Sequence, residues 1–185
     1  MAIDWDFIGT LEGQSVLDAY VPDPETSQSG VTIATGVDLG QLSVAELAGF
    51  GLSAELTAKL QPYVGLRQQA AAAYLAANPL HITKEESDAL DQADRRPDIN
   101  GLTANYAAAI APGAPGFDGL PDPAQTVLAS VSFQYGPNLA VRAPRFWRTA
   151  VNQDWQGMIA ELRNFGDKYP TRRNKEANYL QAGLA

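Results

Sequence analysis

The chain of 185 residues contains no cysteine and a single histidine, His81. Without cysteine it has no disulfide, no thiol nucleophile and no thiolate-bound zinc. One imidazole is too few for a zinc site, the GxSxG pattern of serine hydrolases is absent, and His81 fits a loop residue just before a helix. Any enzymatic chemistry must therefore rest on carboxylates and hydroxyls, and we expect no metal and no cofactor.

Positive charge and long apolar runs are scarce as well. The formal net charge is −8, and no basic patch interleaved with aromatic residues offsets it. Because nucleic-acid binding depends on neutralising phosphates, we expect no such partner. No apolar run approaches the roughly 18 residues that span a bilayer, and Asp4 and Asp6 are acidic where a signal peptide would be basic. We expect no membrane partner and synthesis in the cytoplasm without a signal peptide.

Length and hydropathy indicate one domain. With 45% hydrophobic residues, the chain is long enough for one well-buried core and short for two. We predict a single domain over residues 1–185 of the α+β class, mostly α-helical. A helix and a small β region occupy about residues 1–70, and a helical lobe occupies about residues 71–185.

Three helix starts are marked by local signals. Ser43 with Glu46, and Thr83 with Glu86, have the spacing of a capping box, in which the side chain and backbone of the first turn satisfy each other. The segment "PDPAQTVLASVSFQY" predicts a further helix with Asp122 as its N-cap.

Residues 14–41 have a different pattern. "VLDAYVP" alternates as a strand does, "PDPETSQSG" is rich in turn residues, and "GVTIATGVDLG" combines β-branched residues with glycines. The pattern predicts a small hairpin or sheet after an amphipathic helix that ends in "LEG". So small a sheet contributes little to a core, so its polar residues are candidates for a site; the alternative is a structural flap.

Three motifs in this order resemble a known family. The helix ending "LEG", followed by "AYVPD" and "SGVTIATGVDLGQ", resembles the lysozyme-like muramidases of the phage type, and more closely the pesticin-type bacterial toxins of that superfamily. "SVSFQYG" resembles the central helix of the family, and "RFWRTAVNQDWQGMIAELRNF" with "YPTRRNKEANYL" resembles its closing helices. The resemblance implies a lysozyme-like fold and cleavage of peptidoglycan between N-acetylmuramic acid and N-acetylglucosamine.

Such cleavage needs a proton for the leaving oxygen and a second carboxylate near the sugar. Glu12 lies at the end of an apolar helix, where partial burial would raise its pKa and keep it protonated near neutrality, so the resemblance implies that it is the general acid. In the pesticin-type branch a threonine precedes the catalytic aspartate, and Thr32 followed six residues later by Asp38 matches this order. We therefore favour Asp38 as the base and keep Asp23, between two prolines, as the alternative.

If Thr32 holds the water that attacks the sugar, the reaction inverts configuration, and the two carboxyl groups should stand about 6.5 to 9.5 Å apart. Thr35 is a secondary candidate for substrate binding, because in a regular strand it would point away from Thr32 and needs a turn or bulge to rejoin the site. Gln134 is a candidate for binding an acetamido group, and Tyr135 for contacting a sugar ring. The resemblance also implies that Arg172 or Arg173 approaches Glu12.

The resemblance also implies a biological setting. The chain would be an antibacterial toxin or effector, or an endolysin, that acts in the periplasm and cell wall after delivery by a secretion system or phage lysis machinery. Its partners would be peptidoglycan strands and an immunity or inhibitor protein, and we expect a monomer. The acidic chain gains no long-range attraction to anionic peptidoglycan unless Arg142, Arg145 and Arg148 form a local basic patch. Two alternatives are a non-catalytic glycan-binding module with a lysozyme fold and a chitinase-like hydrolase.

Overall fold

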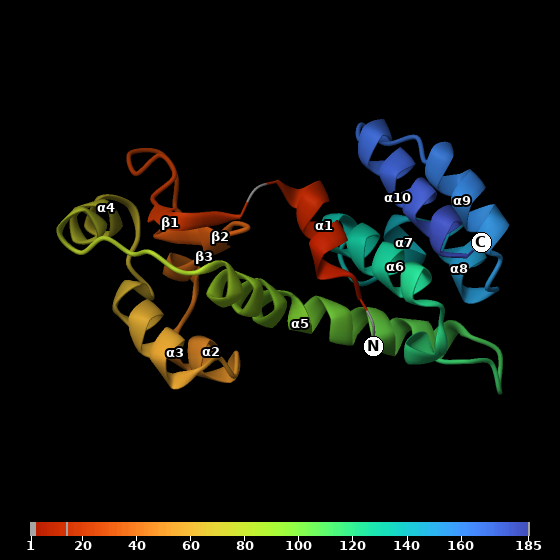
Figure 1. Ribbon diagram of the computed structural model, residues 1–185, viewed down its shortest axis with the longest axis horizontal. Helices are drawn as coiled ribbons and strands as arrows, with labels where there is room; N and C mark the ends of the chain where they lie inside the picture. The colour runs from red at the N-terminus through yellow and green to blue at the C-terminus, as the bar shows by residue number, and fades with distance from the viewer. Residues whose placement is uncertain (1–2, 14, 185) are drawn as a thin grey trace. The chain divides into compact units, whose positions relative to one another are not determined.

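The computed structural model describes residues 3–13 and 15–184 (Figure 1). The chain forms two compact units, which we call the sheet unit and the helical unit. The sheet unit is Glu12–Asp94, and the helical unit combines the residues up to Leu11 with those from Arg95 onward. The prediction of one domain over the whole chain stays a prediction.

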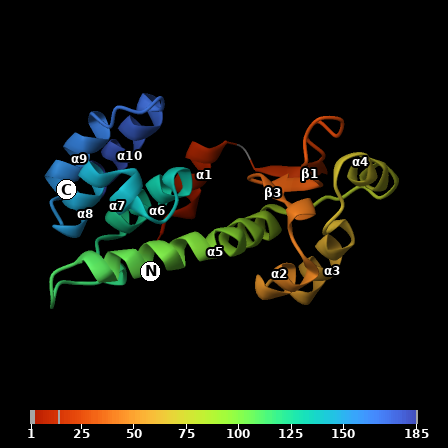
Figure 2. The ribbon, with the colours of Figure 1, turned by 180° about the vertical axis from the view of Figure 1, so that it is seen from behind.

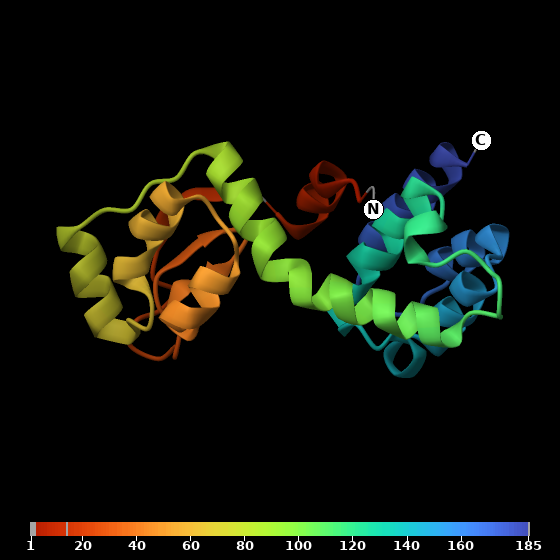
Figure 3. The same cartoon turned by 90° about the horizontal axis from the view of Figure 1, so that it is seen from below.

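The sheet unit contains a small sheet and short helices. Its elements are β1 (Val16–Tyr20), β2 (Thr32–Ala34), β3 (Val37–Asp38), the 3-10 turn η1 (Leu39–Gln41), α2 (Val44–Gly49), α3 (Ala54–Leu60), the 3-10 turn η2 (Gln61–Tyr63), α4 (Gln68–Ala77) and the first part of α5 (Lys84–Ala109). The strands form one antiparallel sheet in the order β1-β2-β3. Figure 3 shows α5, in green, as one uninterrupted helix.

The core of the sheet unit lies between the sheet and its helices. Ile33 from β2, Leu60 from α3 and Leu90 from α5 are fully buried in one apolar cluster. On its other edge β1 bonds to the segment before α5, because Ala19 donates to the carbonyl of Leu80 at 2.9 Å. Both edges of β1 are thus paired, and the strand does not end the sheet as an open edge.

The helical unit is a bundle of helices (Figure 2). Its elements are α1 (Trp5–Glu12) up to Leu11, the second part of α5, the 3-10 turn η3 (Phe117–Gly119), α6 (Asp122–Tyr135), α7 (Leu139–Arg142), α8 (Pro144–Val151), α9 (Trp155–Arg163) and α10 (Pro170–Gly183). Helix α6 is the central one, since every residue from Ala124 to Ser132 is buried. A helix buried all round carries mostly apolar or small residues, and "AQTVLASVS" fits this except for Gln125, whose side-chain amide donates to the carbonyl of Leu120 at 2.9 Å.

The structure confirms the fold class, mostly helical with a small antiparallel sheet near the N-terminus. Both capping boxes are present: Ser43 and Glu46 bond reciprocally at the start of α2, and Glu86 accepts from the Thr83 amide at 2.8 Å at the start of α5. The N-cap of α6 is Pro121 rather than Asp122, which is the first helical residue. Within the described residues, every helix is too short or too polar to cross a membrane.

Candidate functional site

The β2–β3 hairpin brings Thr32 and Asp38 together. The two residues are paired across the strands, one at the start of β2 and the other at the end of β3. Thr32 is buried, at 5% exposure, and its hydroxyl donates to the carbonyl of Gly30 at 3.3 Å. The hairpin register thus confirms that these two residues are neighbours, while their catalytic roles stay predictions.

Asp38 is held by backbone amides. Its Oδ1 accepts from the amides of Gly30 and Gly40, both at 2.9 Å, and the second bond caps η1. Both donors use the same oxygen, so the backbone orients the carboxylate through Oδ1.

Glycine is required at both positions that hold Asp38. A Cβ on Gly30 would lie 2.1 Å from the carbonyl oxygen of Leu66 and 2.5 Å from the Cα of Gly40. A Cβ on Gly40 would meet the same carbonyl at 2.4 Å. The chain therefore packs backbone against backbone here, which only glycine permits, and this close packing positions both amides toward Asp38.

Asp23, the alternative base, lies in an exposed turn. Its backbone is in the left-handed region, with φ of +37°, and its carbonyl accepts from the amide of Ser27 at 2.9 Å. Its carboxylate accepts a hydrogen bond from the hydroxyl of Thr26. Aspartate is one of the few residues that tolerate this backbone conformation and close such a turn with their side chains, so the turn alone accounts for Asp23.

Glu12 is the last residue of α1, as the sequence predicts. Its side chain is exposed, which is contrary to the partial burial expected for a glutamate at the end of an apolar helix. The following Gly13 has φ of +107°, a conformation that ends the helix and that glycine adopts without strain.

Thr35 lies in the turn between β2 and β3, and its role in substrate binding stays a prediction. Its amide and its hydroxyl both donate to Oδ1 of Asp91 in α5, at 3.1 and 2.6 Å. Asp91 is buried, at 8% exposure. This carboxylate of the sheet unit was not identified from the sequence.

The remaining nominated residues, Gln134, Tyr135 and Arg172, belong to the helical unit. Arg172, from α10, donates through Nε to Glu176 at 3.1 Å and through Nη2 to the Ser130 carbonyl at 3.1 Å. Its Nη1 also donates to the carbonyl of Leu11 at 3.4 Å, one residue before Glu12. Arg172 therefore contacts the end of α1, next to the glutamate that the resemblance links to it.

Gln134 and Tyr135, at the end of α6, contact a second arginine. Gln134 accepts a hydrogen bond from Arg173, and the Arg173 guanidinium lies over the Tyr135 ring, 5.5 Å from its centroid. The Tyr135 hydroxyl donates to Asp167 at 2.8 Å. Both side chains thus serve the packing of the helical unit, and their sugar contacts stay predictions.

The charges around Arg173 shift one another's pKa values. Burial by itself lowers the pKa of the guanidinium, but the carboxylates of Glu176 and Asp167 outweigh burial and raise it. Burial likewise raises the pKa of Asp167 on its own, yet hydrogen bonds from Arg173, Tyr135 and the Tyr169 amide bring it below its usual value. Burial and the neighbouring Asp167 raise the pKa of the Tyr135 hydroxyl. All three groups therefore keep their ordinary charge states at neutral pH.

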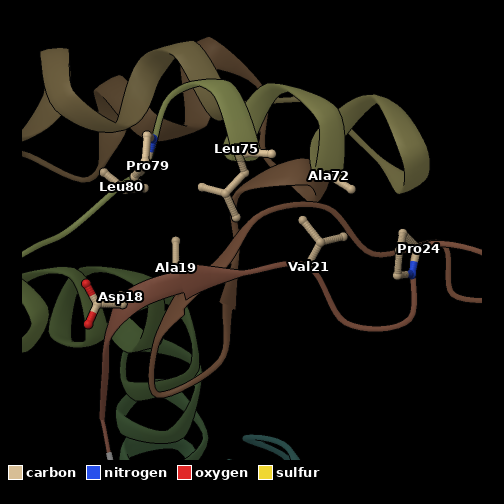
Figure 4. A pocket seen from close by; sticks show the side chains of 9 residues that line it. Asp18, Ala19, Val21, Pro24, Ala72, Leu75, Pro79 and Leu80 are labelled. Atoms are coloured by element: carbon tan, nitrogen blue, oxygen red, sulfur yellow. The ribbon is translucent and has the colours of Figure 1, made fainter.

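An apolar pocket of about 360 Å³ lies on the sheet unit, between β1 and α4 (Figure 4). It is lined by Asp18, Ala19, Val21, Pro24, Ala72, Leu75, Ala76, Pro79 and Leu80. None of the nominated residues lines it, so this pocket is separate from the candidate site. The part of the chain that the structure describes holds no group of three or more histidine, cysteine, aspartate or glutamate side chains arranged to bind a metal.

Comparison with known families adds to this geometry. The family model Pesticin, described as "Bacterial toxin homologue of phage lysozyme, C-term", matches residues 2–156. The chain belongs to the pesticin family. The match includes both the hairpin with Thr32 and Asp38 and the central helix α6, so the resemblance to the pesticin family is confirmed. A comparison with curated proteins gave no match.

Membership of the pesticin family supports a glycoside hydrolase of the lysozyme type in general. The matched residues include Glu12, Asp23, Thr32 and Asp38, all of which lie in the sheet unit. Arg172 lies beyond the matched range, in α10. Family membership alone assigns no role to any of these side chains.

Two groups of polar residues were missed from the sequence. Asp91 follows the buried Ser87 by one helical turn in α5, and this spacing of two polar residues on one face was an available signal. Glu176 follows Arg172 and Arg173 at four and three residues in "RRNKEA", which is the spacing of helical ion pairs. Their burial was not visible, because charged residues at helical spacing are usually exposed.

Proposed function

We propose that this chain is an N-acetylmuramidase that hydrolyses the bond between N-acetylmuramic acid and N-acetylglucosamine in peptidoglycan. The observation that carries the proposal is the pairing of Thr32 with Asp38 across the β2–β3 hairpin, in a chain of the pesticin family. An inverting glycosidase needs a carboxylate that activates one water molecule, and a hydroxyl opposite this carboxylate can help to hold that water.

The hydrogen bonds of the hairpin support the atom that we propose for each step. The Thr32 hydroxyl donates to Gly30, so its oxygen is left as an acceptor for one hydrogen of the water. Asp38 is held through Oδ1, so Oδ2 takes the other proton as the water attacks the anomeric carbon. Glu12 gives its proton to the leaving oxygen, and solvent then restores both carboxyl groups. The attack from the face opposite the leaving group inverts configuration.

Asp38 is favoured over Asp23 as the base. Asp38 faces Thr32 and is oriented by two backbone amides, while Asp23 closes an exposed turn with Thr26. A base must hold one direction relative to the water it activates, and a rigid backbone cradle provides this better than a surface turn.

We propose roles in substrate binding for four further residues. The amide nitrogen of Gln134 binds an acetamido carbonyl, since its oxygen already accepts from Arg173. Tyr135 offers part of its ring to a sugar, Thr35 binds from the hairpin turn, and Arg172 holds the end of α1 before Glu12. The setting that we propose is that of an antibacterial toxin or an endolysin, monomeric, delivered to the cell wall and countered by an immunity protein.

One observation favours a second candidate function. Glu12 is exposed, and an exposed carboxyl lacks the burial that keeps a general acid protonated near neutral pH. A non-catalytic module that binds glycans needs no such acid. The first proposal therefore requires that bound substrate itself excludes water from Glu12.

The test is digestion of purified peptidoglycan, with mass spectrometry of the products, for wild type, Glu12→Gln, Asp38→Asn and Asp23→Asn. We expect soluble muropeptides with reducing N-acetylmuramic acid ends from wild type and Asp23→Asn. Loss of about 10²-fold or more is expected for Glu12→Gln and Asp38→Asn. If wild type binds peptidoglycan but releases no products, the chain is a non-catalytic glycan-binding module. If wild type releases products from chitin alone, the chain is a chitinase-like hydrolase.

A further inference from the structure

Asp91 presents a buried carboxylate to the turn of the β2–β3 hairpin. It lies in the part of α5 that belongs to the sheet unit, and its exposure is 8%. Its Oδ1 accepts both the amide and the hydroxyl of Thr35, at 3.1 and 2.6 Å. One oxygen atom thus holds the backbone and the side chain of the same turn residue, across 56 positions of sequence.

The turn depends on such an anchor. Ala34 and Gly36, on either side of Thr35, have φ of +57° and +104°. For alanine the left-handed conformation is unfavourable, so contacts elsewhere must hold it. The strands that flank the turn have only three and two residues, and their ladder is too short to do this alone.

We propose that Asp91 is a positioning residue for the proposed hydrolysis. By fixing Thr35 it fixes the turn, and through the turn it sets how Thr32 in β2 faces Asp38 in β3. The inference rests on the proposed function, but it concerns a residue that contacts neither sugar nor water. The base of the hairpin is held by Gly30 and Gly40 and its tip by Asp91, so the two catalytic candidates lie between two fixed points.

Four substitutions separate geometry from charge and volume. Asp91→Ala removes the acceptor, whereas Asp91→Asn keeps an oxygen at the same place without the charge. Thr35→Val removes the hydroxyl at nearly constant volume, and Thr35→Ser restores it. Asp88→Ala is the matched control, because Asp88 lies on the same helix, is 42% exposed and pairs with Lys84.

The experiment measures kcat and KM on soluble peptidoglycan fragments, together with thermal unfolding and amide exchange by NMR. We expect kcat to fall about 10- to 100-fold in Asp91→Ala and Thr35→Val, with the fold retained. KM should stay within about twofold in Asp91→Ala, whereas it rises in Thr35→Val, because Thr35 is also a proposed substrate contact. Asp91→Asn and Thr35→Ser should recover most of kcat, and Asp88→Ala should match wild type. The Thr35 amide should exchange at least about tenfold faster in Asp91→Ala.

Two results would overturn the proposal. One is a folded Asp91→Ala with wild-type kcat, whose only defect is a lower unfolding temperature; this would mean that Asp91 merely stabilises the unit. The other is unchanged exchange of the Thr35 amide. If Asp91→Ala does not fold, Thr35→Val and Thr35→Ser decide by the same criteria. A wild type without hydrolysis refutes the proposed function and the catalytic role of Asp91 together, while the exchange rates still show whether Asp91 anchors the turn.

Discussion

At the scale of single residues, the helical unit contains a charged cluster that is almost free of solvent. Arg173 is 1% exposed and Glu176 is fully buried. A buried charge costs several kcal/mol unless it is paired and fully hydrogen-bonded. The planar guanidinium meets this condition, because it donates to Glu176, to Asp167 at 2.9 Å and to Gln134, and lies 4.6 Å from the centroid of the Phe165 ring. The cluster therefore fixes α10 against the end of α6.

Asp167 makes the stability of the helical unit depend on pH. Although burial alone raises its pKa, the bonds from Arg173, Tyr135 and Tyr169 hold the folded-state pKa below the unfolded value. Its stabilising effect is therefore complete above about pH 4 and is lost as pH falls through the folded pKa. We expect Asp167→Asn to lower the free energy of unfolding by about 1–3 kcal/mol at pH 7, and by less at about pH 3.

Urea unfolding at the two pH values measures this difference. The control is Asp118→Asn, because Asp118 is an exposed carboxylate of the same unit and its substitution should change little at either pH. An equal loss for Asp167→Asn at both pH values would contradict the linkage to its carboxyl group.

At the scale of elements, the β2–β3 hairpin is held by its surroundings more than by its own ladder. Its register contains only the pairs Thr32 with Asp38 and Ile33 with Val37. A hairpin this short is only marginally stable by itself. The packing of Gly30 on Gly40 and the hydrogen bonds to Asp91 add the stability that the strand pairing does not provide. A methyl group added at either glycine would therefore clash with backbone atoms.

We expect Gly30→Ala to lower the free energy of unfolding by about 3 kcal/mol, because its Cβ meets backbone atoms that have no room to move. Hydrolysis should fall as well, since the Gly30 amide holds Asp38. Gly49→Ala is the control: Gly49 ends α2, a Cβ there has no atom within 4 Å, and the helix should gain up to about 1 kcal/mol. Urea unfolding and muropeptide release measure both effects; a Gly30→Ala as stable as wild type would refute the close packing.

At the scale of the whole molecule, the residues that the structure describes form two apolar cores. One cluster lies in the sheet unit and the other in the helical unit. Helix α5 supplies both, with Leu90 in the first and Leu102 in the second, and each of these side chains is fully buried. Two cores in one chain imply two regions that open separately in local unfolding.

We expect Leu90→Ala and Leu102→Ala each to lower the free energy of unfolding by about 2–5 kcal/mol, through lost burial and the cavity that remains. Amide exchange followed by mass spectrometry should show faster exchange mainly in Glu12–Asp94 for Leu90→Ala, and mainly in the residues from Arg95 onward for Leu102→Ala. The two variants control for each other, since both change leucine to alanine in one helix. The same rise across both units in both variants would indicate a single cooperative core.

Much of the fold was predictable because its signals are local. The capping residues of α2 and α5, the turn residues before β2 and the glycine after α1 each act within a few positions of the element they define. The N-cap of α6 was displaced by one residue, since Pro121 and Asp122 both suit a helix start and local signals do not choose between neighbours. No local sequence pattern predicted that α1 belongs to the same unit as the C-terminal helices.

By itself, the sequence determined the residue types available for chemistry, the order of helices and strands, and the motifs that identify the pesticin family, because these depend on composition and short spacing. It also indicated Thr32 and Asp38, which the hairpin register then joined. Only the tertiary structure decided that Glu12 is exposed, that Asp91 holds Thr35 across 56 positions, and that Arg172 contacts Leu11 across 161. Burial and hydrogen bonding depend on which distant segments pack together, and residue spacing along a chain carries no measure of that.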